Sequence, residues 1–346
     1  MEEDKYELLH LLEDVQQNCD ILYQTTMFWR NANDMLTKNI INKGVENFRK
    51  LLPCLNMFVP SYSMNFNSSN TALYEKVKNN ISTELKLSKN NLLLIEQLVS
   101  GQLLAQNDYN IFLATDIDKP PYISNVSESN IGEPINQHEF NNKKFSRSLL
   151  NYLLGINFLK KHIDTSEIKT VFEIGGGFGT LAEILLHDPR NDIFYLDFDI
   201  PPVSFVSSYY LKQLLGKRFL NYKEICERKI DISDIHKYAD AAVVPAFEIE
   251  NIQLDCDLFV NFISFQEMEP NIVENYLKHI KRVNTKYILL RNIKEGKNPQ
   301  KVETPITSDY YDRYLPDYEL VATNVLPFGY RTPDGFNSEL RLYKRK

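Results

Sequence analysis

The chain has little cysteine, and its cysteines have no arrangement that would bind a metal. Cys19, Cys54, Cys226 and Cys256 are far apart and form no C-x-x-C pair, which argues against a zinc ribbon, a thiol redox motif or a disulfide scaffold. Apolar runs are also short, and none approaches the roughly 18 residues that cross a bilayer. The acidic start Met1–Lys5 does not resemble a secretory signal. We therefore expect a cytoplasmic protein with reduced thiols and no membrane span.

Positive charge is scarce as well. The formal net charge is -7 and the pI is near 5.5, which argues against a general surface for nucleic acid. The short basic clusters Lys143-Lys144 and Arg341–Lys346 are interpreted as solvated faces or tail. We therefore expect no nucleic-acid partner.

The pattern of hydrophobic residues changes near residue 145. With 346 residues, the chain is long enough for a large core and a smaller second unit. Helical spacing dominates Tyr6–Tyr23 and Tyr74–Leu104, whereas Lys119–Lys144 is a long irregular segment. Such segments inside compact domains are often functional. We predict a mainly helical domain over residues 1–145, with this segment as a lid or acceptor loop, and a second domain over residues 146–346.

The second domain alternates strands and helices, which predicts a parallel sheet covered on both faces. It ends differently, since two strand-like segments, Glu319–Leu326 and Glu339–Tyr343, follow each other without a helix between them. We expect them to form a terminal antiparallel hairpin. The expected strands are residues 170–174, 193–198, 241–244, 257–262 and 287–291, and the expected helices are residues 149–162, 180–187, 203–215 and 272–283.

Glycines are few in the chain but concentrate after the first of these strands. Gly175, Gly177 and Gly179 alternate there, and Glu173 lies two residues before the first of them. Strand, glycine turn and helix together favour a nucleotide-like ligand. A dinucleotide fold has its third glycine one position later, where this chain has Thr180. A carboxylate at Glu173 would repel a pyrophosphate but suits a cationic ligand that carries an amino acid.

Further candidate residues follow the second and third strands. Asp197 and Asp199 lie about 20 residues after the glycines, where an acidic side chain binds ribose hydroxyls. Both lie on the same face of the strand; we favour Asp199 because it is at the strand's end, and Asp197 remains open. Phe247 after the third strand could stack on an adenine. The alternatives for adenine are core packing of Phe247, or Asp231 and Asp234 as its partners.

The segment Asn261–Met268 follows the fourth strand and carries polar side chains to the sheet's carboxyl edge. Asn261 would line the ligand site, and Glu267 is the first candidate for a general base. Glu267 could equally belong to a capping box of the next helix. His138 in the long irregular segment is the second candidate base. No Asp-Asp pair or histidine cluster follows the fourth strand, so we expect no metal.

Together these runs resemble class I S-adenosylmethionine (SAM) methyltransferases and, among them, the sugar O-methyltransferases of bacterial glycan and antibiotic gene clusters. The similarity covers about residues 120 to 345 and rests on the runs Gly132–Pro134, Leu149–Leu159, Glu173–Leu185, Asp199–Pro201 and Asn261–Met268. It implies a Rossmann-like class I methyltransferase sheet. It also implies SAM as cofactor, S-adenosylhomocysteine (SAH) as product and a hydroxyl of a saccharide or glycoconjugate as methyl acceptor.

Seven residues are therefore the candidate cofactor ligands: Glu173, Gly175, Gly177, Gly179, Asp199, Phe247 and Asn261. Three alternatives to a sugar methyltransferase stay open. They are a SAM enzyme for a polyketide, phenolic or amine acceptor, an NAD(P)-dependent oxidoreductase or epimerase, and a non-catalytic partner protein with a SAM fold. The early third glycine and the terminal hairpin argue against the oxidoreductase. The oligomeric state is open too, a homo-oligomer included.

Overall fold

The chain folds around one eight-stranded sheet, in a computed structural model that describes residues 2–51, 62, 76, 79–80, 83, 88–297, 302–325 and 337–346. The strand order is β5-β6-β4-β3-β7-β8-β10-β9. In chain order the strands are β3 (Thr170–Ile174), β4 (Phe194–Asp199), β5 (Phe219–Asn221), β6 (Ala241–Pro245), β7 (Leu258–Phe262), β8 (Tyr287–Ile293), β9 (Tyr318–Asn324) and β10 (Ser338–Arg345).

Six of these strands run parallel, from β5 at one edge to β8. Strand β10 is antiparallel to both of its neighbours, β8 and β9. The predicted parallel sheet with a terminal antiparallel hairpin is therefore confirmed. The sequence did not predict β5, which has three residues, nor that β10 would lie between β8 and β9.

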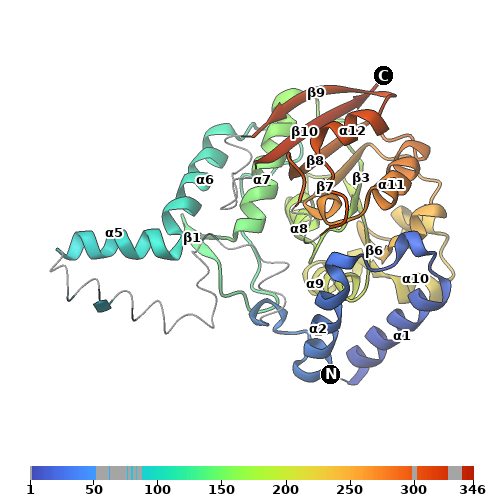
Figure 1. Cartoon of the computed structure of the whole chain (residues 1–346), viewed down its shortest axis with the longest axis horizontal. Helices are drawn as coiled ribbons and strands as arrows, with labels where there is room; N and C mark the ends of the chain where they lie inside the picture. The colour runs from blue at the N-terminus through green and yellow to red at the C-terminus, as the bar shows by residue number, and fades with distance from the viewer. Residues whose placement is uncertain are drawn as a thin grey trace.

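Helices cover both faces of the sheet (Figure 1). Successive residues of a strand point to opposite faces, so Val171 and Phe172 belong to two different hydrophobic cores. The first core includes residues of α7 (Arg147–His162), α8 (Thr180–His187) and α9 (Val203–Leu215). The second includes residues of α10 (Tyr222–Arg228), α11 (Pro270–Arg282) and α12 (Ser308–Tyr314). This is the predicted α/β architecture.

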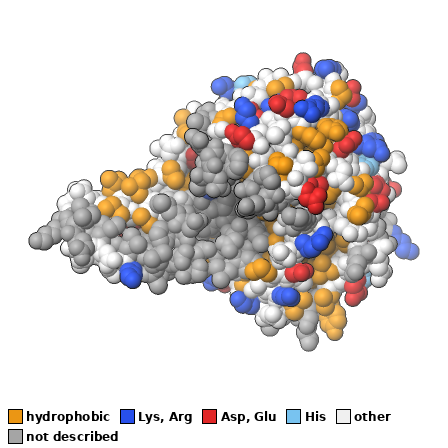
Figure 2. Space-filling model, viewed as in Figure 1, with side chains coloured by type: hydrophobic (Ala, Val, Ile, Leu, Met, Phe, Trp, Pro, Cys, Tyr) orange, Lys and Arg blue, Asp and Glu red, His pale blue; other side chains and the backbone are white. Residues whose placement is uncertain are grey.

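The N-terminal part is mainly helical where the structure describes it. Helices α1 (Glu2–Asn18) and α2 (Met27–Lys43) are joined by a short 3₁₀ turn, η1 (Ile21–Tyr23), and α2 was not predicted. Helix α5 (Lys89–Ser100) has no buried residue, and it projects beside α6 (Gln102–Thr115) away from the sheet (Figure 1). Its exposed leucines show as an apolar surface in Figure 2. The predicted Leu55–Asn70 loop and the start of Tyr74–Leu104 lie almost wholly outside the described residues.

The segment before α7 is irregular, as expected, except for a small hairpin of β1 (His138–Phe140) and β2 (Lys143–Phe145). None of the helices in the described part of the chain combines the length and apolar composition that crossing a bilayer requires. Other 3₁₀ turns within the described residues are η2 (Phe48–Lys50), η4 (Gly216–Arg218), η5 (Ile232–Lys237), η6 (Ala246–Glu250) and η7 (Ser264–Glu267).

Candidate active site

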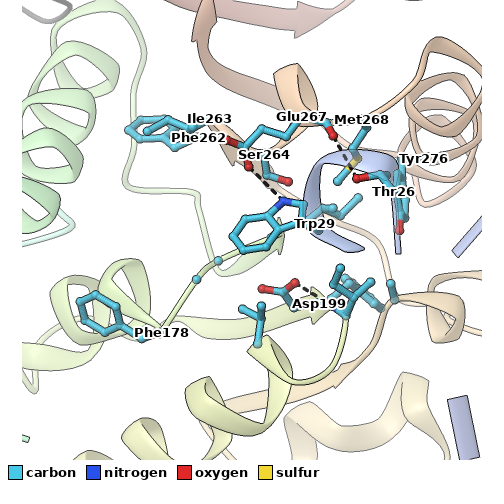
Figure 3. Close-up of a pocket in the computed structure, with 18 of the residues that line it drawn as sticks. Thr26, Trp29, Phe178, Asp199, Phe262, Ile263, Ser264, Glu267, Met268 and Tyr276 are labelled. Atoms are coloured by element: carbon cyan, nitrogen blue, oxygen red, sulfur yellow. Dashed lines mark hydrogen bonds between the residues drawn. The ribbon is translucent and has the colours of Figure 1, made fainter. Parts of the chain in front are cut away.

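A cavity lies at the carboxyl ends of β3, β4 and β7, the edge at which open parallel sheets bind ligands. Its wall comes from the turns after β3 and β7, the end of β4, and parts of α2, α7, α11 and β8. Figure 3 shows side chains from several of these elements pointing toward one another. Segments that are far apart in the sequence therefore meet around one space.

The glycine turn after β3 forms one side of this cavity. Gly175 and Gly177 both line it and have φ angles of 71° and 66°, which cost other residues about 1–2 kcal/mol. A Cβ atom on Gly175 would lie 2.3 Å from the Ser264 hydroxyl oxygen, whereas one on Gly177 would have no atom within 4 Å. Packing between two turns therefore requires Gly175, and Gly177 leaves space for a ligand. Gly179 is the N-cap of α8 and does not line the cavity.

Asp199 lines the cavity at the end of β4, whereas Asp197 does not. The Asp199 side chain accepts a hydrogen bond from the Ile200 amide at 2.7 Å, and its Oδ2 atom has no hydrogen-bond partner. Burial raises the pKa of Asp199 to about 8. Asp197 lies beneath the glycine turn, where it accepts a hydrogen bond from the Gly176 amide at 3.1 Å. Of the two carboxylates, Asp199 is therefore the one that a ligand in the cavity can reach.

Glu173 also lies beneath the turn and does not line the cavity. It is completely buried and accepts hydrogen bonds from the hydroxyls of Tyr152 and Tyr195 at 2.7 and 2.6 Å. Burial raises its pKa to about 7. Glu173 can therefore act on a ligand through its charge and its support of the turn, without touching it.

The turn after β7 forms the opposite side of the cavity. Asn261 is buried below it and does not line the cavity; its amide donates to the Ile174 carbonyl at 2.9 Å and its Oδ1 accepts from the Phe265 amide at 3.0 Å. Asn261 thus joins the ends of β3 and β7. Ile263 has a φ of 76°, a strained conformation for a β-branched residue. These features hold a turn that presents Ser264 and Glu267 to the cavity.

Helix α2 covers the cavity beside Glu267. The Trp29 indole N–H donates to Glu267 Oε2 at 3.0 Å, and the Thr26 hydroxyl donates to the Glu267 carbonyl at 3.1 Å. The Lys297 ammonium donates to the other carboxylate oxygen of Glu267. Trp29 and Thr26 line the cavity themselves, as Figure 3 shows. An N-terminal helix therefore completes a site that the sheet begins.

Two predicted site residues lie elsewhere. His138 is on β1, where its ring packs against Tyr62 and Phe140, and burial lowers its pKa. Phe247 packs edge-on against Tyr222. Neither side chain lines the cavity, although Phe247 directly follows Ala246, which does.

Several residues that line the cavity were not predicted from the sequence, among them Thr26, Trp29 and Arg291. Trp29 is the only tryptophan in the chain, but nothing in the sequence places α2 over the sheet. Arg291 lies in β8, the predicted fifth strand, and its position near the carboxyl end was the signal that could have identified it. Within the described residues, no three histidine, cysteine, aspartate or glutamate side chains are grouped to hold a metal.

Comparisons with known proteins find similarity in fold. No protein-family model matches the chain, and no curated protein matches its sequence. Similar solved structures include the mitomycin 7-O-methyltransferase MmcR (16% identity, 57% of this chain and 54% of that chain, TM-score 0.36) and the pyocyanin biosynthetic protein PhzM (12% identity, 57% and 56%, TM-score 0.38). Magnesium protoporphyrin IX methyltransferase (ChlM) from Synechocystis PCC 6803 with bound SAM is another (9% identity, 60% and 86%, TM-score 0.38).

The chain thus spans little more than half the length of the first two proteins. At these identities and TM-scores, the similarity concerns the fold and carries no conclusion about activity.

Proposed function

We propose that the chain is a SAM-dependent O-methyltransferase. The observation that carries this proposal is the carboxylate of Asp199, which lines the cavity opposite the glycine turn and has one oxygen atom without a hydrogen-bond partner. A buried carboxylate oxygen without a donor is costly, and the two hydroxyls of a ribose would satisfy it. Gly177 leaves room for the ligand to approach the backbone of the turn. These features fit SAM better than a dinucleotide, whose pyrophosphate would lie close to the buried Glu173.

The residues around Glu267 fit the chemistry of this reaction. Bound SAM would supply a methyl group on a sulfonium: an O–C bond forms at the acceptor hydroxyl, the S–C bond breaks, and its electrons remain on sulfur. The hydroxyl must lose its proton, and the Glu267 carboxylate lines the cavity where it can accept one. Trp29 and Lys297 fix the orientation of this carboxylate. Trp29 of helix α2 lines the same cavity, where it would shield a bound ligand from water.

We further propose a saccharide or glycoconjugate as the acceptor. The resemblance of Gly132–Pro134 and Leu149–Leu159 to sugar O-methyltransferases supports this. The lining of the cavity supports it as well, because it combines the polar side chains of Ser148 and Asn151 with the indole ring of Trp29. An indole gives a sugar ring an apolar face, and polar neighbours can bond its hydroxyls.

Thermal unfolding with added ligands tests the cofactor. We expect SAM and SAH at millimolar concentration each to raise the melting temperature by a few degrees, because binding at about 100 times Kd adds about 2.7 kcal/mol. NADPH should have no effect. A shift with NADPH alone would favour the oxidoreductase and contradict the proposal. Methyl transfer to sugars, phenols and amines, followed by mass spectrometry, then identifies the acceptor class.

Replacing Glu267 with glutamine tests the proposed base. Glutamine keeps a hydrogen-bond acceptor for the Trp29 indole but cannot take a proton, so turnover should fall roughly 100- to 10,000-fold while SAM affinity stays within about threefold. Single-turnover kinetics and calorimetric titration measure the two quantities. Full activity in this variant would exclude Glu267 as the base.

A further inference from the structure

Three carboxylates lie together beneath and beside the glycine turn. Glu173 on β3 and Asp197 on β4 are direct partners in the register of the two parallel strands, and Asp199 follows on the same face of β4. Their exposed fractions are 0%, 0% and 6%. Like charges opposite each other on neighbouring strands are destabilising, and burial increases that cost.

The groups that hydrogen-bond these three residues are uncharged. In the described part of the chain, no lysine, arginine or histidine forms an ion pair with any of the three, and their hydrogen-bond donors are tyrosine hydroxyls and backbone amides. Asp197 and Asp199 each have one oxygen atom without a partner. Two other buried carboxylates are paired with a cation, Glu128 with Arg49 and Glu339 with Arg341.

This arrangement favours the protonated forms of the three groups. Burial raises the pKa of Glu173 to about 7 and that of Asp199 to about 8. Burial raises the pKa of Asp197 as well, and the charges of Asp199 and Glu173 add to that effect. A cation that enters the cavity would favour the ionised forms, because opposite charge nearby lowers the pKa of a carboxyl group.

Other titratable and charged groups lie close to these carboxylates or line the same cavity. Tyr152 on α7 and Tyr276 on α11 are neutral, since burial raises their pKa values well above the usual range. Glu267 on η7 is paired with Lys297. Arg291 on β8 lines the same cavity, and its charge acts on Tyr152, the hydrogen-bond donor of Glu173; within the described residues it forms no ion pair with the three carboxylates themselves.

We propose that Glu173, Asp197 and Asp199 make the cavity discriminate by charge, binding the sulfonium SAM in preference to the neutral thioether SAH. This inference rests on the proposed function. The two ligands share the ribose and adenine and differ in the methyl group and its positive charge. Loss of that charge on methyl transfer weakens the attraction to the carboxylates, which favours exchange of product for new cofactor.

Calorimetric titration of the full chain with SAM and with SAH, at pH 6, 7 and 8.5, tests the inference. The ratio of SAM to SAH affinity should rise roughly tenfold from pH 6 to pH 8.5, as expected for one added charge at a moderate effective dielectric constant. In buffers of different ionisation enthalpy, SAM binding should release more protons than SAH binding. Parallel pH profiles and equal proton release for the two ligands would overturn the inference.

Glu173→Gln removes one charge without touching the ligand, and it should lower the SAM to SAH ratio roughly tenfold at pH 8.5. Glu183→Gln is the matched control. Glu183 is also buried, accepts a hydrogen bond from Tyr210 and does not line the cavity, so this variant should keep the wild-type ratio.

Equal weakening of SAM and SAH in Glu173→Gln would make Glu173 a structural residue and contradict the inference. If this variant does not fold, the proton release of the wild-type chain still decides the question. Failure of the wild-type chain to bind either ligand would instead refute the proposed function.

Discussion

Asp197 and Asp199 are two residues apart on β4, but only Asp199 lines the cavity. The ribose is common to SAM and SAH, so Asp199→Ala should weaken both ligands, and SAM more than SAH because the variant also removes one of the three buried carboxylates. We expect the SAH affinity to fall roughly thirtyfold, because hydrogen bonds to a charged group contribute about 1.5–3 kcal/mol. Asp197→Asn, which can still accept from the Gly176 amide, should leave SAH affinity unchanged.

Calorimetric titration of both variants with SAH checks this prediction. A wild-type affinity in Asp199→Ala together with a loss in Asp197→Asn would assign the ribose to Asp197.

The sequence pattern predicted where the glycine turn lies, but not why each position in it requires glycine. The strand–turn–helix pattern predicted ligand contact for Gly175, Gly177 and Gly179. In the structure, Gly177 has open space where a side chain would be, whereas Ser264 and Leu211 occupy the corresponding space at Gly175 and Gly179. These neighbours come from β7–η7 and α9, so their approach depends on tertiary packing that residue spacing does not contain.

The role of Asn261 could not be predicted from residue spacing either. Its place after a parallel strand predicted a ligand contact, but its amide bonds the ends of two strands. Both uses require a polar residue at the same position, so the sequence alone does not separate them.

At the scale of elements, α2 acts as a cover for the cavity. Its contacts with the body include the Asn33 amide donating to the Pro201 carbonyl at 3.1 Å and the Thr26 hydroxyl donating to the Glu267 carbonyl. Removing both bonds in a Thr26→Val, Asn33→Ala double variant should speed SAM dissociation roughly tenfold, because each neutral hydrogen bond contributes about 0.5–1.5 kcal/mol.

Stopped-flow fluorescence of Trp29, the only tryptophan, measures this rate directly, since its ring lines the cavity. Asn39→Ala is the control, because the Asn39 amide bonds only within α2, to the Met35 carbonyl. Equal dissociation rates in the wild type and the double variant would show that α2 does not retain the cofactor.

Sequence patterns predicted the α/β elements much better than α2. The strands β3, β4, β6, β7 and β8 are short apolar runs between helices, a pattern that reports burial directly. Helix α2 contains Asn31, Asn33, Asn39 and Asn42, and asparagine has a low intrinsic helix propensity. Packing of Leu36 and Ile40 into the core stabilises a helix that its local sequence does not favour.

For the molecule as a whole, buried carboxyl groups should make stability depend on pH. Burial raises the pKa of Glu183 from 4.5 to about 7. Such a group binds its proton more tightly when folded, so its stabilising contribution is complete below about pH 4.5 and is lost as the pH rises through 7. Ligand-free protein should therefore be less stable at pH 8 than at pH 5.

Glutamine does not titrate, so Glu183→Gln removes the loss of stability at high pH that Glu183 causes. Relative to the wild type, the variant should gain roughly 1–3 kcal/mol in free energy of unfolding between pH 5 and pH 8. Urea denaturation at the two pH values measures the difference. A constant offset between variant and wild type at both pH values would show that Glu183 does not titrate in this range.

The order of segments in the whole molecule was only partly predictable. Alternating strands and helices indicated the sheet, and two final strands indicated the hairpin. The insertion of β10 between β8 and β9, and the placement of α2 over the cavity, depend on contacts between distant segments. The composition of one segment does not encode such contacts.

A crystal structure of the chain grown with SAH tests the central claim most directly. We predict SAH in the cavity, with its ribose hydroxyls on the carboxylate of Asp199 and its amino-acid end beside Gly175–Gly177. SAH bound elsewhere, or a cavity that stays empty at millimolar SAH, would contradict the assignment of this site to the cofactor.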